Sequence, residues 1–110
     1  MATNYKHQSV QGTAGTGTYA TLYNTGASTQ AVVSTILITN TAATTATYRI
    51  AIMSSAGTPA AADWLVYDSV VAGNDVICLT LGIAMGNNEF IRVSSSANTV
   101  TFSAFVSEIS

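Results

Sequence analysis

A chain of 110 residues is long enough for one domain with one core and too short for two. Charged residues make up 7% of it, against about 25% in a typical soluble domain, and the net charge is -2. These values exclude a nucleic-acid partner, which would require several Lys or Arg side chains on one face, and no apolar run approaches the roughly 18 residues of a membrane helix.

A surface with so few charges has little protection against association, so we expect other subunits to cover much of it. The single cysteine, Cys78, cannot form an intrachain disulfide, and we expect it to be a small buried apolar residue. The first residues lack the charged region and apolar core of a signal peptide. Synthesis and assembly in a cytoplasm are therefore expected.

Residues 1–17 contain little that could enter a core. Gly12, Gly15 and Gly17 are interleaved with threonine there, which predicts a flexible extended arm ahead of a domain at 18–110. Two interpretations stay open: a frayed terminus, or an arm that becomes ordered on a neighbouring subunit.

The first two strands are predicted at 18–24 and 31–40. In the first, TYATLYN, Tyr19 and Tyr23 are expected on one face and Leu22 on the other. The second, AVVSTILITN, is the strongest β-forming stretch of the chain. Its apolar residues point both ways, which predicts a central strand covered on both sides: Val32, Ile36 and Ile38 on one face, Val33 and Leu37 on the other.

Five further strands complete the predicted set, at 47–53, 63–71, 76–81, 89–95 and 99–107, with a loop at 82–88. Arg49 and Arg92 are expected to face water. Alternation predicts the following core residues: Tyr48, Ile50 and Ile52; Ile77, Leu79 and Leu81; Ile91 and Val93; and Val100, Phe102, Ala104 and Val106. In 63–71, Leu65 and Tyr67 alternate with Trp64, Val66 and Asp68.

Short strands at this spacing, with turn signals between them and no helical period, predict an all-β fold. One sheet alone would leave a broad apolar face in water, so two facing sheets are the better solution. We therefore expect an antiparallel two-sheet β-sandwich, or a small jelly roll, of about seven to eight strands.

No catalytic or metal-binding set is recognisable. His7 is the only histidine and lies in the predicted arm, where nothing would hold a catalytic base rigidly. Zinc would need more His or Cys ligands, and Asp63, Asp68 and Asp75 do not form a calcium loop. We expect no enzyme activity, no cofactor and no metal.

Trp64 and Tyr67 leave one alternative open. Surface aromatics can stack on a sugar ring, as in lectin-like sandwiches. The favoured interpretation is that both side chains belong to the core or to a subunit interface, where Trp and Tyr are enriched.

Four segments together resemble a known family. They are LYNTGASTQAVVSTILITNT, ATYRIAI, DWLVYDSVVAGNDVICLTLGIAM and FIRVSSSANTVTFSAFVSEIS, which span roughly residues 20–110. In order and spacing they are similar to small virion structural proteins of tailed bacteriophages, notably those of marine cyanobacteria. The chain departs from that pattern at 24–26, where Val-Pro is commoner, and at Cys78, where a polar residue is usual.

The resemblance implies a building role in a virion, in many copies. The first choice is a capsid decoration (cement) protein that forms a homotrimer and binds the major capsid protein. The alternative is an accessory module of the tail, baseplate or fibre. The candidate partner contacts are Tyr5, Lys6, His7, Tyr19, Val33, Leu37, Trp64 and Tyr67.

Overall fold

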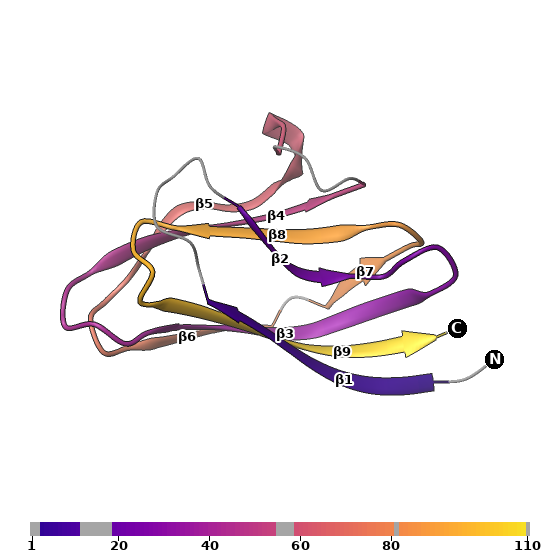
Figure 1. Cartoon of the computed structure of the whole chain (residues 1–110), viewed down its shortest axis with the longest axis horizontal. Helices are drawn as coiled ribbons and strands as arrows, with labels where there is room; N and C mark the ends of the chain where they lie inside the picture. Colours follow the sequence, from indigo (N-terminus) through magenta and orange to yellow (C-terminus); the bar gives the residue numbers. More distant parts are fainter. Residues whose placement is uncertain (1–2, 12–18, 55–58, 81, 110) are drawn as a thin grey trace.

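The computed structural model describes residues 3–11, 19–54, 59–80 and 82–109. These residues form strands joined by turns, with a single 3-10 turn, η1 (Ala61–Asp63), and none of their helices is long and apolar enough to cross a membrane (Figure 1). The strands are β1 (Thr3–Gln11), β2 (Ala20–Asn24), β3 (Gln30–Asn40), β4 (Ala46–Met53), β5 (Trp64–Val71), β6 (Val76–Leu79), β7 (Ile83–Met85), β8 (Phe90–Ser95) and β9 (Val100–Ile109).

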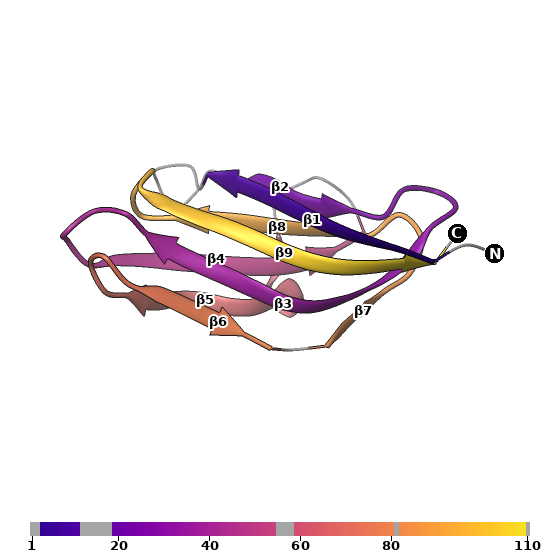
Figure 2. The ribbon, with the colours of Figure 1, turned by 90° about the horizontal axis from the view of Figure 1, so that it is seen from below.

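The strands form two antiparallel sheets that face one another. Sheet A has the order β1-β9-β3-β6, with β7 also paired to β3, and sheet B has the order β2-β8-β4-β5. Figure 2 shows sheet A lying across sheet B, with β3 inside sheet A between β9 and the β6–β7 edge. The prediction of an antiparallel β-sandwich, with 31–40 as a central strand, is confirmed.

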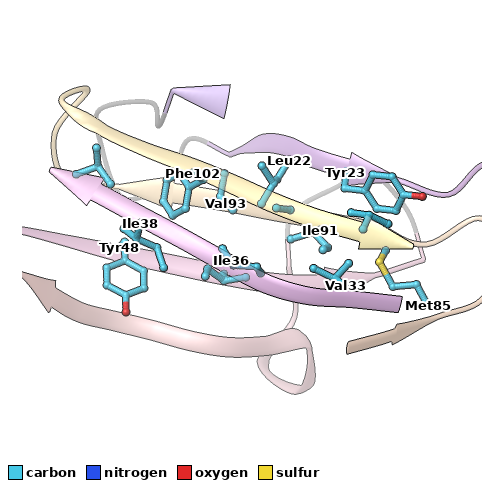
Figure 3. Packing of buried hydrophobic residues seen from close by; sticks show 14 of the residues in the cluster. Leu22, Tyr23, Val33, Ile36, Ile38, Tyr48, Met85, Ile91, Val93 and Phe102 are labelled. Carbon is cyan, nitrogen blue, oxygen red and sulfur yellow. The ribbon is translucent and has the colours of Figure 1, made fainter. Parts of the chain in front are cut away.

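The core fills the space between the two sheets (Figure 3). Ile36 and Ile38 of β3 and Phe102 of β9 are completely buried, and Phe102 meets Tyr48 of β4 edge to face at 6.3 Å between ring centroids. On β9 the alternation is regular, and all four residues predicted to face the core do so. Two sheets are required because each alone would leave these side chains in water.

A β-bulge in β3 overturns one predicted pattern. The pairing of β3 with β9 shifts register between Val33 and Thr35, so one extra residue lies on β3 there. The shift brings Val33 onto the same inward face as Ile36, with no exposed surface, while Val32 is 46% exposed. The prediction that Val32 shares a face with Ile36 was therefore wrong, because strict alternation does not survive an inserted residue.

Register shifts also change the pattern at β2. Because the pairing of β2 with β8 shifts between Thr21 and Tyr23, Leu22 and Tyr23 are both buried, contrary to their predicted opposite orientations. Tyr19 lies just ahead of the strand.

Strand β4 departs from its predicted pattern in the part after Ile50 and at Arg49. Ile52 is half-buried and packs against the core, but Ala51 and Met53, which were not predicted to face the core, are more deeply buried. The side chain of Arg49 is only 14% exposed and does not face open water.

The predicted flexible arm is in part a strand. Residues 3–11 form β1, which pairs with β9 over its whole length, and the remainder of the expected arm, 12–17, lies outside the described residues. The prediction failed because β1 is held mainly by backbone hydrogen bonds to β9, and few of its side chains enter the core. Composition reveals buried side chains better than it reveals backbone pairing.

The region 76–88 differs from its prediction in two ways. Part of the expected loop forms β7, which pairs with β3 so that Ile83 lies opposite Val33. Cys78 is exposed and was expected to be buried. Ile77 and Leu79 pack against the core as predicted, so the strand's alternation directs Cys78 to the outer face of sheet A beside Leu37. Leu81 lies outside the described residues.

Candidate interaction surfaces

An arginine–aromatic cluster lies on the outer face of sheet B. It consists of Tyr19, Arg49, Trp64, Tyr67 and Asp68. The Trp64 and Tyr67 rings meet edge to face at 5.0 Å between centroids, and Tyr19 lies 5.9 Å from Trp64. The Arg49 guanidinium carbon stands 4.0 Å from the centroid of Tyr67 and 5.6 Å from that of Trp64, close enough for cation–π attraction to both rings.

A bidentate ion pair between Arg49 and Asp68 holds this cluster together. Arg49 Nε donates to Asp68 Oδ1 at 2.6 Å, and its Nη2 donates to Oδ2 at 3.0 Å. Asp68 lies in a bulge of β5 and has a φ of 54°, a conformation that Asp tolerates better than most residues. The hydrogen bonds from Arg49 hold the pKa of the Asp68 carboxyl below its ordinary value, and in return they raise the pKa of Arg49.

A second arginine extends this surface toward β2. Arg92 of β8 donates from Nη1 to Thr21 Oγ1 at 2.6 Å and from Nη2 to the carbonyl of Tyr19 at 3.3 Å. Its side chain is half-buried and was expected to face water. The outer face of sheet B therefore carries two of the three basic residues of the chain, together with three aromatic rings.

The outer face of sheet A has a different chemistry. Tyr5, Val32, Phe105 and Ile109 are exposed there to 85%, 46%, 39% and 41%. The Phe105 ring stacks on His7 at 5.3 Å between centroids. Beside this pair is a shallow hollow of about 480 Å³, whose walls are mainly apolar: Tyr5, Lys6, His7, Ser34, Phe105, Val106 and Ser107.

A buried carboxylate joins three strands at the far end of the core. Glu108 of β9 is only 8% exposed and accepts a hydrogen bond from the hydroxyl of Tyr23 in β2. Lys6 of β1 approaches the same carboxylate at 3.4 Å. Burial, and then the bond to Glu108, raise the pKa of the Tyr23 hydroxyl well above its ordinary value. Lys6 is thus engaged within the molecule.

The eight residues proposed from the sequence as partner contacts divide into four groups. Tyr5 and His7 lie on the outer face of sheet A, with the half-buried Leu37 further along it. Lys6 pairs with Glu108. Val33 is completely buried in the core, so it cannot touch a partner, and that prediction was wrong. The structure brings the other three together in the arginine–aromatic cluster: Tyr19, Trp64 and Tyr67.

Sequence reasoning missed other members of both surfaces. Phe105 could have been found, because the predicted core alternation of β9 leaves it facing outward. Val32 could not have been found in this way, since its outward orientation depends on the bulge in β3. Arg49 was expected to be solvated, and its contact with Asp68 depends on the pairing of β4 with β5.

The ionisable residues considered for chemistry are dispersed. His7 contacts Ser9 Oγ at 2.8 Å through Nε2. Asp63 accepts a hydrogen bond from the Ala60 amide, and Asp75 accepts one from the Val76 amide, both at 2.8 Å. Within the described ranges, no three His, Cys, Asp or Glu residues gather in a way that could hold a metal ion.

Comparison with known proteins identifies a likeness of fold. No protein-family model and no curated protein matches the chain. A chain of the crystal structure of the T13 viral particle of infectious bursal disease virus matches with a TM-score of 0.54 at 10% identity, over 96% of this chain and 30% of that one. A chain of the Gx strain structure of that virus matches with a TM-score of 0.52 at 15% identity, over 97% and 32%.

The shared feature is the β-sandwich. The chain spans about a third of the length of the viral chains that it matches. Nearly all of it is covered by each match, so the likeness extends to the whole described sandwich.

Proposed function

We propose that the protein is a structural component of a virus particle. The observation that carries this proposal is the match of nearly the whole chain to about a third of a chain in each of two infectious bursal disease virus structures. The surface is consistent with a building role, because only 7% of residues are charged and apolar side chains are exposed on both sheets. The proposed role requires no catalysis.

More specifically, we propose a capsid decoration (cement) protein of a tailed bacteriophage, present in many copies as homotrimers and assembled in the host cytoplasm. The resemblance of residues 20–110 to small virion proteins of such phages supports this assignment, and the major capsid protein is the proposed partner. The proposed contact is the outer face of sheet A around Phe105, which combines exposed apolar side chains with a hollow.

Binding to emptied, expanded capsids tests the proposal. The wild-type protein should sediment with such capsids and raise the temperature at which they break open. Phe105→Glu should lose binding, since it places a charge in the apolar contact, while Val70→Glu, at a 60% exposed position on β5 of sheet B, should retain it.

Other outcomes would redirect or overturn the assignment. Loss of binding with Val70→Glu alone would transfer the contact to sheet B. Absence of binding to capsids, with binding to purified tails or baseplates, would favour the alternative of an accessory tail module. Absence from purified virions would overturn the structural role altogether.

A glycan-binding role is a second candidate, favoured by one observation. Tyr67 is 56% exposed beside the half-buried Trp64, so sheet B presents an aromatic surface next to Arg49. If a sugar stacks there, the wild-type protein should give a glycan-array signal that Tyr67→Ala and Trp64→Ala both abolish. Both variants should still bind capsids. An array without signal for the wild-type protein would remove this candidate.

A further inference from the structure

Strand β1 is a long, open edge of sheet A. All nine of its residues pair with β9, from Thr3 opposite Ile109 to Gln11 opposite Thr101, without a register shift. Figure 1 shows β1 at the margin of sheet A, and no strand of the described ranges pairs with its other side. Alternate backbone N–H and C=O groups along β1 therefore point away from the sheet and can pair with another strand.

The other sheet edges are short or irregular. Strand β5 has register shifts against β4 and a left-handed Asp68, and β2 is five residues long with a shift of its own. The far edge of sheet A is divided between β6, with four residues, and β7, with three. Such interruptions protect an edge from pairing with another chain, and β1 has none of them.

The sequence of β1 also lacks protective charge. Lys6 is its only charged residue, and the Lys6 ammonium already faces Glu108 at 3.4 Å. The strand contains no proline, and Tyr5 presents an aromatic ring that is 85% exposed. A free edge with these properties favours association with another strand.

We propose that β1 pairs antiparallel with β1 of a second copy across a two-fold axis that passes between the two His7 residues. This register is the only one in which all nine residues pair, because Thr3 then lies opposite Gln11. Lys6 lies opposite Gln8 of the second copy, so no like charges face one another, as they would in a register centred on Lys6. The charges of β1 therefore do not oppose pairing between two copies of this strand.

The same axis accounts for the exposed tyrosine. A two-fold axis perpendicular to the sheet keeps the outer faces of both copies on one side, so Tyr5 of each copy lies opposite Ser9 of the other. The small Ser9 leaves room for the ring above the joined sheet, next to the stacked His7 and Phe105. The inference is independent of where the protein sits on a particle, since a two-fold contact would link neighbouring trimers as readily as isolated chains.

Cysteine cross-linking tests the axis. In a Cys78→Ser background, which removes the exposed native thiol, His7→Cys should form a two-chain disulfide on mild oxidation, because directly opposite Cβ atoms lie about 4.5–5.5 Å apart. Ser9→Cys is the matched control: it occupies the same face, but its counterpart in the second copy is about 14 Å away along the strand. A denaturing gel should show the linked pair for His7→Cys and not for Ser9→Cys.

Hydrogen exchange provides a test without substitutions. In the wild-type protein, the backbone amides of β1 that point away from β9 should exchange several-fold more slowly at high than at low protein concentration. Unlinked His7→Cys, equal linking of Ser9→Cys, or exchange that does not depend on concentration would each overturn the proposal.

Discussion

At the scale of single residues, Asp68 shows how a strained position is stabilised by an ion pair. Its φ of 54° lies in the left-handed region, and Arg49 binds both carboxylate oxygens. Because the native pKa of Asp68 is lowered, its contribution is present above the unfolded pKa of about 3.9 and is lost as the pH falls through the lower native value.

We therefore predict that Asp68→Asn, which tolerates the same φ, lowers the melting temperature at pH 7 by about 2 to 4 °C. Below pH 4 the difference from the wild-type protein should shrink. Melting curves from pH 7 to pH 2 provide the measurement. In an Arg49→Met background the substitution should have little effect at any pH, and an undiminished effect there would contradict the ion-pair explanation.

The bond between Tyr23 and Glu108 predicts the opposite dependence on pH. The pKa of Tyr23 is raised from 10.0, so its contribution to stability is complete below pH 10 and is lost as the pH rises through the native value. Tyr23→Phe should cost about 1–3 kcal/mol at pH 7, since Glu108 would lose a hydroxyl donor in a buried site.

Urea unfolding at pH 7 and pH 11 tests this prediction. Between these values the urea midpoint of the wild-type protein should fall further than that of Tyr23→Phe. Some alkaline loss should remain in the variant, because burial also raises the pKa of Tyr48. Equal losses in both proteins would show that Tyr23 does not carry the effect.

At the scale of elements, the bulge in β3 decides which of two adjacent valines belongs to the core. Val33 is completely buried and Val32 is 46% exposed. We predict that Val33→Asp destabilises the fold by about 4 kcal/mol or more, because it buries an unpaired carboxylate, and that Val32→Asp costs about 1 kcal/mol or less. Urea midpoints compare the pair, and the reverse order would place the register shift elsewhere.

The elements also show where sequence patterns are sufficient. Alternation identified the inward face of β9 and the core residues of β8, because the extra residues at the register shifts lie on the partner strands β3 and β2 and leave β9 and β8 regular. It failed in β2 and β3, where pairing shifts by a residue. A bulge depends on how two strands fit together, and a period-two pattern in one strand does not contain that information.

At the scale of the whole molecule, one core serves both sheets. Trp64, the only tryptophan, lies in sheet B, whereas circular dichroism reports on the strands of both sheets. Since neither sheet can bury its apolar face without the other, we predict a single cooperative unfolding transition. Tryptophan fluorescence and far-ultraviolet circular dichroism should give the same urea midpoint, and two separated midpoints would show that the sheets unfold independently.

The two surfaces of the molecule were predictable to different degrees. Trp64 and Tyr67 lie three residues apart in one strand, and strict alternation places them on opposite faces. The register shifts in β5 bring both rings together on the outer face of sheet B. The positions of Arg49 and Tyr19 in the arginine–aromatic cluster depend on the pairing of β4 with β5 and on the placement of the segment before β2. The open edge at β1 was not predicted, because the same residues looked unstructured by composition.

The sequence by itself determined the fold class, since short alternating strands rich in β-branched residues can bury their apolar faces only as two facing sheets. Tertiary structure decided which side of β3 is the core, that residues 3–11 form a strand, and which arginines meet aromatic rings. The reason is physical: side-chain periodicity is a local property, whereas register, edge pairing and contacts across strands depend on residues as far apart as Thr3 and Ile109.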